Sequence, residues 1–210
     1  MIGNAMILLR EELSAYMVAQ GDPANVVIEN IGLFDTDEGQ NLENSLVISV
    51  VNIEEESTLK NGNLFTKLGD GTARYENRPV FLNLYVLFTS NFTGGVPPNN
   101  AYVQALKRLS LVIRFFQGKN TFTPATSPVI LPGDLGDLSK PEIANLKIIA
   151  ELYTLTFEQI NHLWGSLGGR QIPFAMYKMR LVMITDKSVQ KIVPLIEEVT
   201  TNIVKITDNH

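Results

Sequence analysis

The sequence contains no cysteine and only two histidines, and these absences exclude several classes of chemistry. A chain without cysteine cannot form a disulfide, bind an iron–sulfur cluster through thiolates or use a thiol nucleophile, and it suits a reducing cytoplasm. The histidines are His162 and His210. A Ser–His–acid triad would have to use His162, which lies beside Trp164 in a segment typical of a helix, so a metal or catalytic role for it is not expected.

Charged residues are also scarce. They make up 19% of the chain, below the roughly 25% of average soluble domains. The formal net charge is −5, which argues against nucleic acid as a partner because nucleic-acid binding depends on basic surfaces. Arg10 interrupts the first apolar run, and no uncharged apolar stretch reaches about eighteen residues. We therefore expect neither a signal peptide nor insertion into a membrane.

Motifs for phosphate binding and nucleophilic catalysis are absent as well. The chain has neither a P-loop nor a strand-linked Gly-x-Gly-x-x-Gly. Residues 165–168 lack the spacing of a nucleophile elbow, and Gly168, Gly169 and Arg170 are typical of a helix end followed by a turn.

Two acidic segments can be compared with metal sites. The loop that contains Asp134 and Asp137 lacks the downstream glutamate of a calcium loop. Three adjacent glutamates, residues 54–56, are typical of a solvated turn. We therefore expect no cofactor, no metal and no enzymatic activity, with an enzyme acting through Glu54 or Asp134 as an alternative.

Hydrophobic periodicity predicts an α/β (α+β) protein with a mixed central sheet flanked by two or three helices. The first helix is expected after an N-cap at Asn4 and ends at Gly21. A second helix is expected to bury one apolar face near residues 102–118. This face consists of Tyr102, Leu106, Leu109, Ile113 and Phe116.

Strands and loops follow from alternation and turn residues. Strands are expected at 26–28, 46–53, 80–88, 146–154 and 175–184, and the apolar run 80–88 predicts a central strand. Residues 54–79 predict a hairpin or an exposed loop, and the proline-rich segment 119–141 predicts an ordered loop. Thr156 and Gln159 match a capping box, which predicts a short helix from there to about Trp164. We expect one domain, residues 1–186, followed by a tail or arm, residues 187–210.

Three stretches, in this order, resemble one family. The first is 78–88 (Arg-Pro-Val-Phe-Leu-Asn-Leu-Tyr-Val-Leu-Phe), and the second is 102–117 (Tyr-Val-Gln-Ala-Leu-Lys-Arg-Leu-Ser-Leu-Val-Ile-Arg-Phe-Phe-Gln). The third runs from 152–155 (Leu-Tyr-Thr-Leu) through 159–164 (Gln-Ile-Asn-His-Leu-Trp) and 167–169 (Leu-Gly-Gly) to 177–180 (Tyr-Lys-Met-Arg). The chain resembles the cap, or tail-terminator, proteins of contractile injection systems, which are phage-tail-like bacterial particles. The resemblance covers roughly residues 3–185.

The resemblance implies a structural protein without catalytic residues. It implies a ring, a hexamer, that closes the proximal end of the inner tube and sheath and stops their polymerisation. Such a protein would assemble in the bacterial cytoplasm and then remain part of the particle. Candidate contacts with other chains are Lys107, Arg108 and Arg114 on one helix, with Glu54, Glu55 and Arg170 elsewhere.

Strand addition is the expected mode of contact with the sheath. An edge strand of this chain, together with the tail of residues 187–206, would pair with an arm of the sheath protein. The alternative is a baseplate or tube-associated adaptor, or an assembly chaperone of the same particle.

Overall fold

The computed structural model describes residues 1–33, 42, 44–56, 65–67, 72–77, 79–90, 100–168, 171–184 and 189–194. The chain forms two compact units. The larger unit consists of Met1–Leu59 and Val80–Ile184, and the smaller unit consists of Lys60–Pro79 and Thr185–His210. No helix in the described part of the chain is both long and apolar enough to cross a membrane.

A six-stranded mixed sheet organises the larger unit. Its strand order is β1-β2-β5-β8-β7-β6, and only the pairing of β1 with β2 is parallel among the described strands. The strands are β1 (Asn25–Ile28), β2 (Ser45–Glu55), β5 (Val80–Ser90), β6 (Thr121–Phe122), β7 (Ile148–Leu152) and β8 (Phe174–Ile184). The α+β class and the mixed central sheet predicted from the sequence are confirmed.

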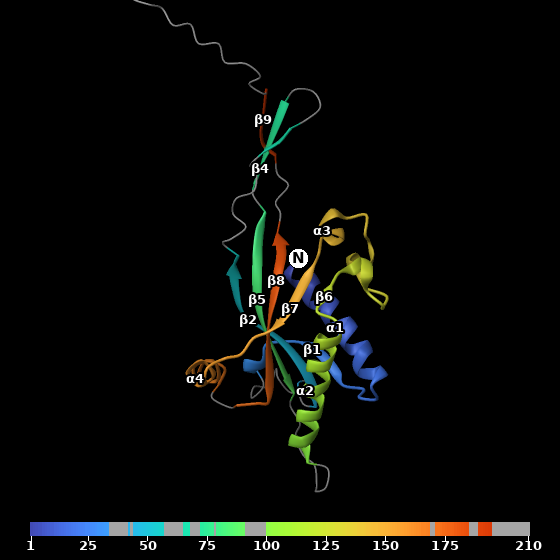
Figure 1. Ribbon diagram of the computed structural model, residues 1–210, viewed down its shortest axis with the longest axis vertical. Coiled ribbons are helices and arrows are strands. Elements are labelled where there is room, and N and C mark those ends of the chain that lie inside the picture. Colours follow the sequence, from blue (N-terminus) through green and yellow to red (C-terminus); the bar gives the residue numbers. More distant parts are fainter. Residues whose placement is uncertain are drawn as a thin grey trace, which may run out of the picture. The chain divides into compact units, whose positions relative to one another are not determined.

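Strand β5 is central, as its apolar sequence predicts. Successive side chains of a strand point to opposite faces, so Leu84, Val86 and Phe88 enter one core while Tyr85 and Leu87 enter the other. The sheet is therefore covered on both faces. Helices α1 (Ile2–Ala19) and α2 (Ala101–Gly118) lie on the first face, and α4 (Phe157–Ser166) lies on the second (Figure 1).

Helix α1 begins at Ile2, so the predicted N-cap at Asn4 is wrong. Asn4 lies within the first helical turn, because the apolar residues on both sides of it fit one continuous helical spacing. The helix ends at Ala19, and Gly21, expected as its stop, follows in a left-handed conformation with a φ of 79° that suits glycine.

Helix α4 begins with the predicted capping box. The Thr156 hydroxyl accepts from the Gln159 backbone N–H at 3.3 Å, and the Gln159 side chain accepts from the Thr156 N–H at 2.9 Å. This start fixes the helix so that Trp164, 4% exposed, packs into the second core.

The segment between α2 and β7 is an ordered loop, as predicted. It contains short helical turns at η4 (Pro124–Thr126) and η5 (Gly133–Gly136) and the four-residue helix α3 (Pro141–Ala144). A further turn, η1 (Ile31–Leu33), follows β1. Strand β7 begins at Ile148, two residues later than the expected start, because Leu146 still belongs to the turn that follows α3.

The smaller unit contains a three-stranded antiparallel sheet in the order β3-β4-β9. Strands β3 (Phe65–Lys67) and β4 (Thr72–Glu76) pair antiparallel within residues 54–79, where the sequence predicts a hairpin or an exposed loop. Strand β9 (Val189–Pro194) falls in the segment 187–210, which the sequence predicts to be a tail or arm, and pairs with β4. The boundary at residue 186 stays a prediction.

Candidate functional site

A polar cluster around Tyr85 lies on the sheet face that also carries α4. The Tyr85 hydroxyl donates to Glu54 Oε2 at 2.9 Å, and Asn52 Nδ2 donates to Glu54 Oε1 at 3.1 Å. The Tyr153 ring meets the Tyr85 ring edge-on, with centroids 5.0 Å apart. The Lys178 ammonium lies 5.7 Å from the Tyr85 ring centroid. Side chains from β2, from β8 and from the residue after β7 therefore converge on Tyr85 of β5.

The Tyr85 phenol is a hydrogen-bond donor and not a base. Burial raises the pKa of Tyr85 to about 12, and its hydrogen bond to the Glu54 carboxylate acts in the same direction. At neutral pH the phenol therefore keeps its proton and holds Glu54 in place. The cluster thus holds the exposed Glu54 carboxylate in place on the sheet through two hydrogen bonds.

A further hydrogen bond and an ion pair extend this face. Asn83 is buried in β5, and its Nδ2 donates to Glu56 Oε2 at 2.9 Å. Arg180 of β8 pairs with Glu151 of β7 at 3.2 Å. This face of the sheet thus carries hydrogen-bonded or ion-paired carboxylates from β2 and β7.

The candidate contact residues from the sequence lie in different environments. Glu54 belongs to the cluster around Tyr85. Glu55, the next residue of β2, points to the opposite face of the sheet and is exposed. Lys107 and Arg114 are exposed on α2. Arg170 lies outside the described residues. Whether these side chains contact another chain stays a prediction.

Arg108 does not belong to the basic face expected for α2. It is 6% exposed, and its guanidinium binds Asp22 through two hydrogen bonds of 2.9 Å while donating to the Asn44 carbonyl at 2.7 Å. This bidentate pair ties α2 to the turn after α1. Arg108 shares the buried face with Ala105 and Val112, which is why it points inward.

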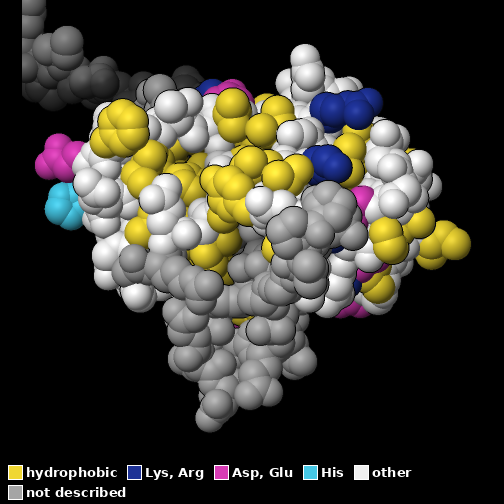
Figure 2. Space-filling model, turned by 90° about the horizontal axis from the view of Figure 1, so that it is seen from below, with side chains coloured by type: hydrophobic (Ala, Val, Ile, Leu, Met, Phe, Trp, Pro, Cys, Tyr) yellow, Lys and Arg dark blue, Asp and Glu magenta, His cyan; other side chains and the backbone are white. Residues whose placement is uncertain are grey.

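The exposed side of α2 is also more apolar than expected. Tyr102, Leu106 and Ile113, which helical periodicity places on the buried face, are 59%, 43% and 42% exposed. The buried face is rotated toward Val112 and Phe115, because these residues and Phe116 contact the sheet and α1. Figure 2, viewed from the end at which α2 begins, shows hydrophobic side chains gathered on the face of the molecule seen from there.

A shallow cavity of about 420 Å³ lies beside the start of α2. It is lined by Tyr102 and Leu106 together with the segment that leads into β8, Gln171–Phe174.

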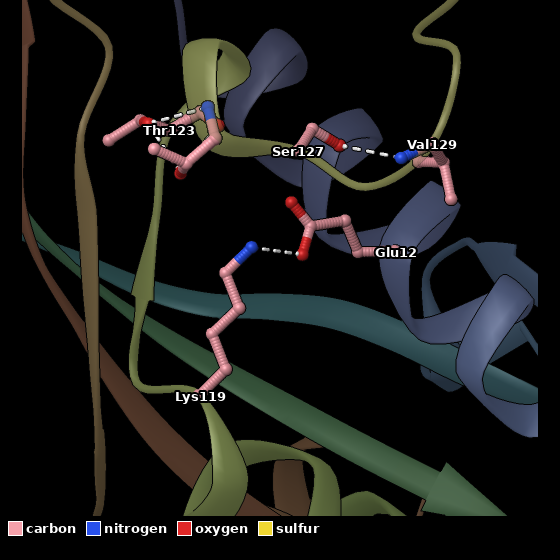
Figure 3. A network of polar contacts seen from close by, with 6 residues as sticks. Glu12, Lys119, Thr123, Ser127 and Val129 are labelled. Carbon is pink, nitrogen blue, oxygen red and sulfur yellow. Dashed lines mark hydrogen bonds and ion pairs between the residues drawn. The ribbon is translucent and has the colours of Figure 1, made fainter.

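A larger cavity of about 650 Å³ lies between α1, the end of α2 and the following loop. At its edge Lys119 reaches across from α2 and pairs with Glu12 of α1 at 2.6 Å (Figure 3). The Glu12 side chain is only 1% exposed, whereas the Lys119 side chain is 31% exposed, so the carboxylate end of the ion pair is buried and the ammonium end reaches solvent. The sequence indicates that Glu12 is buried, because Glu12 lies on the same helical face as the buried Leu9 and Leu13. A buried carboxylate needs a partner of opposite charge.

The described residues hold no group of three His, Asp or Glu side chains that could bind a metal ion. The His162 imidazole is 81% exposed and lies 3.9 Å from Glu158. Asp134 pairs with Lys140 at 2.6 Å, and hydrogen bonds from Ser139 lower the pKa of Asp137. Neither of the two cavities above is lined by Glu54 or Asp134.

Comparison with known proteins gives a family and a fold. A family model described as the Pvc16 N-terminal domain matches residues 7–198. No curated protein matches the chain significantly.

Two solved structures share the fold. One is the sheath/tube terminator of an extracellular contractile injection system (PVC) in its extended state, with 13% identity and a TM-score of 0.55 over 96% of this chain. The other is the tube-terminating cap of the anti-feeding prophage, with 15% identity and a TM-score of 0.56 over 93% of this chain. The match covers 64% and 59% of those two chains, so this chain spans less than two thirds of either.

Proposed function

Because the chain belongs to the Pvc16 N-terminal domain family, we propose that it is a structural cap, a tail terminator that closes the proximal end of the inner tube and sheath of a contractile injection system. Its activity is to bind the last tube and sheath subunits and to stop further addition. This role needs complementary surfaces and no catalysis.

The observation that carries the proposal is the shared fold. This chain matches over nearly its whole length a sheath/tube terminator and a tube-terminating cap. The exposed apolar side chains on α2 and the charged sheet face agree with a protein that works by packing against other chains.

The proposed assembly is a ring, a hexamer, in the bacterial cytoplasm before it joins the particle. A growing tube end exposes strand edges and apolar grooves that recruit the next subunit. A terminator must cover that surface without presenting a copy of it. A closed ring achieves this because each subunit uses up its lateral contacts on its neighbours.

Contact with the sheath by strand addition is part of the same proposal. Strand β9 is an edge of the three-stranded sheet, and an edge strand can accept a strand from a partner. Deletion of residues 187–210 removes this edge. Particles that remain normally capped after that deletion would remove strand β9 from the proposed contact.

The experiment that tests the role is localisation of the chain on purified particles. The chain is expressed with a short epitope tag in a strain that assembles the particle, and gold-labelled antibody is located by electron microscopy. A cap gives label at the end opposite the baseplate. Label at the baseplate would support an adaptor. No label on finished particles would support an assembly chaperone. Either result contradicts the proposal.

A further inference from the structure

One aromatic side chain of the larger unit is left almost entirely in solvent. Phe157, the first residue of α4, is 88% exposed. Its helix packs on the sheet through Ile160, Leu163 and Trp164, so Phe157 adds nothing to that core. Glu158 beside it is 85% exposed on its side chain. The start of α4 therefore presents an apolar ring next to a carboxylate.

The 650 Å³ cavity on the other side of the sheet has complementary properties. Its walls include the Tyr16 and Phe115 rings, whose centroids are 5.3 Å apart, together with Pro128 and Val129. Volumes between about 300 and 1,000 Å³ are typical of pockets that bind small molecules and cofactors, so this cavity is large enough for a phenylalanine side chain. Aromatic rings attract one another edge-on or offset.

The charge of this cavity is also complementary to α4. Lys119 and Glu12 neutralise each other as an ion pair. Arg114, also in the lining, forms no ion pair with any residue that the structure describes. Among the described residues, Arg114 therefore gives the cavity a positive charge without an ion-pair partner, and Glu158 at the start of α4 carries a negative charge.

We propose that Phe157 of one copy inserts into the cavity between α1 and α2 of a neighbouring copy, with Glu158 of the first copy paired to Arg114 of the second. This contact is the lateral joint of the proposed ring, and in that respect the inference rests on the proposed function. It specifies which two surfaces of the chain meet.

The fold makes this contact one between copies. Helix α4 packs on one face of the six-stranded sheet, whereas α1 and α2 pack on the other (Figure 1). The start of α4 with Phe157, and the cavity between α1 and α2, are therefore two different surfaces of one subunit. A contact between two different surfaces is head-to-tail, and its repetition closes a ring when the rotation between neighbouring copies divides a full turn evenly.

Self-association of the full chain is measured by sedimentation velocity over a range of micromolar concentrations. Phe157→Ala is expected to weaken association by about 30-fold or more, the loss typical of a central aromatic anchor. Leu138→Ser, which replaces another exposed apolar side chain, 46% exposed, serves as the matched control and should change association little.

Exchange of the two charges tests the proposed pair of Arg114 and Glu158 directly. The result does not depend on one variant that could be misfolded. Arg114→Glu and Glu158→Arg are each expected to weaken association by about tenfold, and the double variant is expected to recover most of it. Recovery in the double variant would not occur if either substitution acted by unfolding the chain.

The absence of cysteine allows a specific cross-link. Gln117 is exposed and lines the cavity. A copy with Gln117→Cys mixed with a copy with Glu158→Cys should form a disulfide-linked dimer under mild oxidation, because such bonds require Cα atoms within about 7 Å. A Ser139→Cys copy in place of the Glu158→Cys copy should not.

Several results would overturn the proposal. They are a wild-type chain that stays monomeric at micromolar concentrations, normal association of Phe157→Ala, no recovery in the charge exchange, and a Phe157→Ala defect confined to binding of the sheath or tube protein.

If Phe157→Ala particles keep normal rings and normal ends, this contact fails while the cap function stands. If wild-type rings form through this contact but leave tube length uncontrolled, the contact stands while the cap function fails.

Discussion

At the scale of single residues, Arg108 turns inward and forms a buried ion pair that stabilises the fold. Its two hydrogen bonds to Asp22 and one to the Asn44 carbonyl join three segments that are distant in sequence. The sequence predicts that this position is helical but not that it is buried. Charge alone places an arginine on a solvated face, and only the position of Asp22 after the helix end reverses that expectation.

Replacement of Arg108 by alanine should lower the free energy of unfolding by about 3 kcal/mol, because it leaves the Asp22 carboxylate without its buried partner. Urea denaturation measures this loss. Lys107→Ala, one position away on the exposed side of α2, is the control and should stay within about 0.5 kcal/mol of the wild type. Equal effects of the two substitutions would contradict the assigned burial.

The Tyr85 hydroxyl gives a pH dependence with a defined sign. Its pKa is about 12 in the folded chain against an ordinary value of 10.0. Between these two values the unfolded chain releases the proton and the folded chain keeps it, so the stability present below pH 10.0 is lost as the pH rises toward about 12.

Tyr85→Phe should therefore remove part of this alkaline loss. At neutral pH the variant should be about 1 kcal/mol less stable, because the hydrogen bond to Glu54 is lost. The stability difference from the wild type should shrink above pH 10.0. Urea midpoints measured across this range test it, and a constant difference at all pH values would show that the hydroxyl is solvated in the folded chain.

At the scale of elements, helices and strands follow well from local chemistry, and their ends follow less well. The apolar run of β5 and the capping box of α4 both form where the sequence predicts them. Helix α1 instead begins before its expected cap. The helical spacing of apolar residues starts ahead of Asn4, so the helix and its backbone hydrogen bonds start there too. The buried face of α2 depends on the positions of the sheet and α1. The periodicity of apolar residues within α2 carries no information on those positions.

The capping box provides a prediction at this scale. Thr156→Ala should reduce the stability of the larger unit by about 1 kcal/mol, because the side-chain bond that caps the start of α4 is lost. The chain has one tryptophan, and Trp164 lies buried in α4, so its fluorescence reports directly on this helix during urea denaturation.

Asn161→Ala in the same helix is the matched control for this substitution. Asn161 is exposed, and alanine has the higher helix propensity, so the control should be neutral or slightly stabilising. A neutral Thr156→Ala variant would mean that packing of Trp164 alone holds α4 in place.

At the scale of the whole molecule, the family follows from the order of three sequence stretches, and the contact surfaces do not. The sequence identifies Glu54, Lys107 and Arg114 as charged and accessible, and the structure confirms their exposure. It does not reveal that Phe157 is exposed or that α1 and α2 enclose a cavity, because both depend on how distant segments pack. These two features carry the proposed joint between subunits.

The central claim is that this chain ends tube growth, and the length of the tube tests it most directly. Particles are assembled with and without the chain, and tube and sheath lengths are measured by negative-stain electron microscopy. A terminator predicts uniform lengths when the chain is present and a broad distribution with overlong tubes when it is absent. Identical length distributions in the two preparations would contradict the assignment of this chain as the cap.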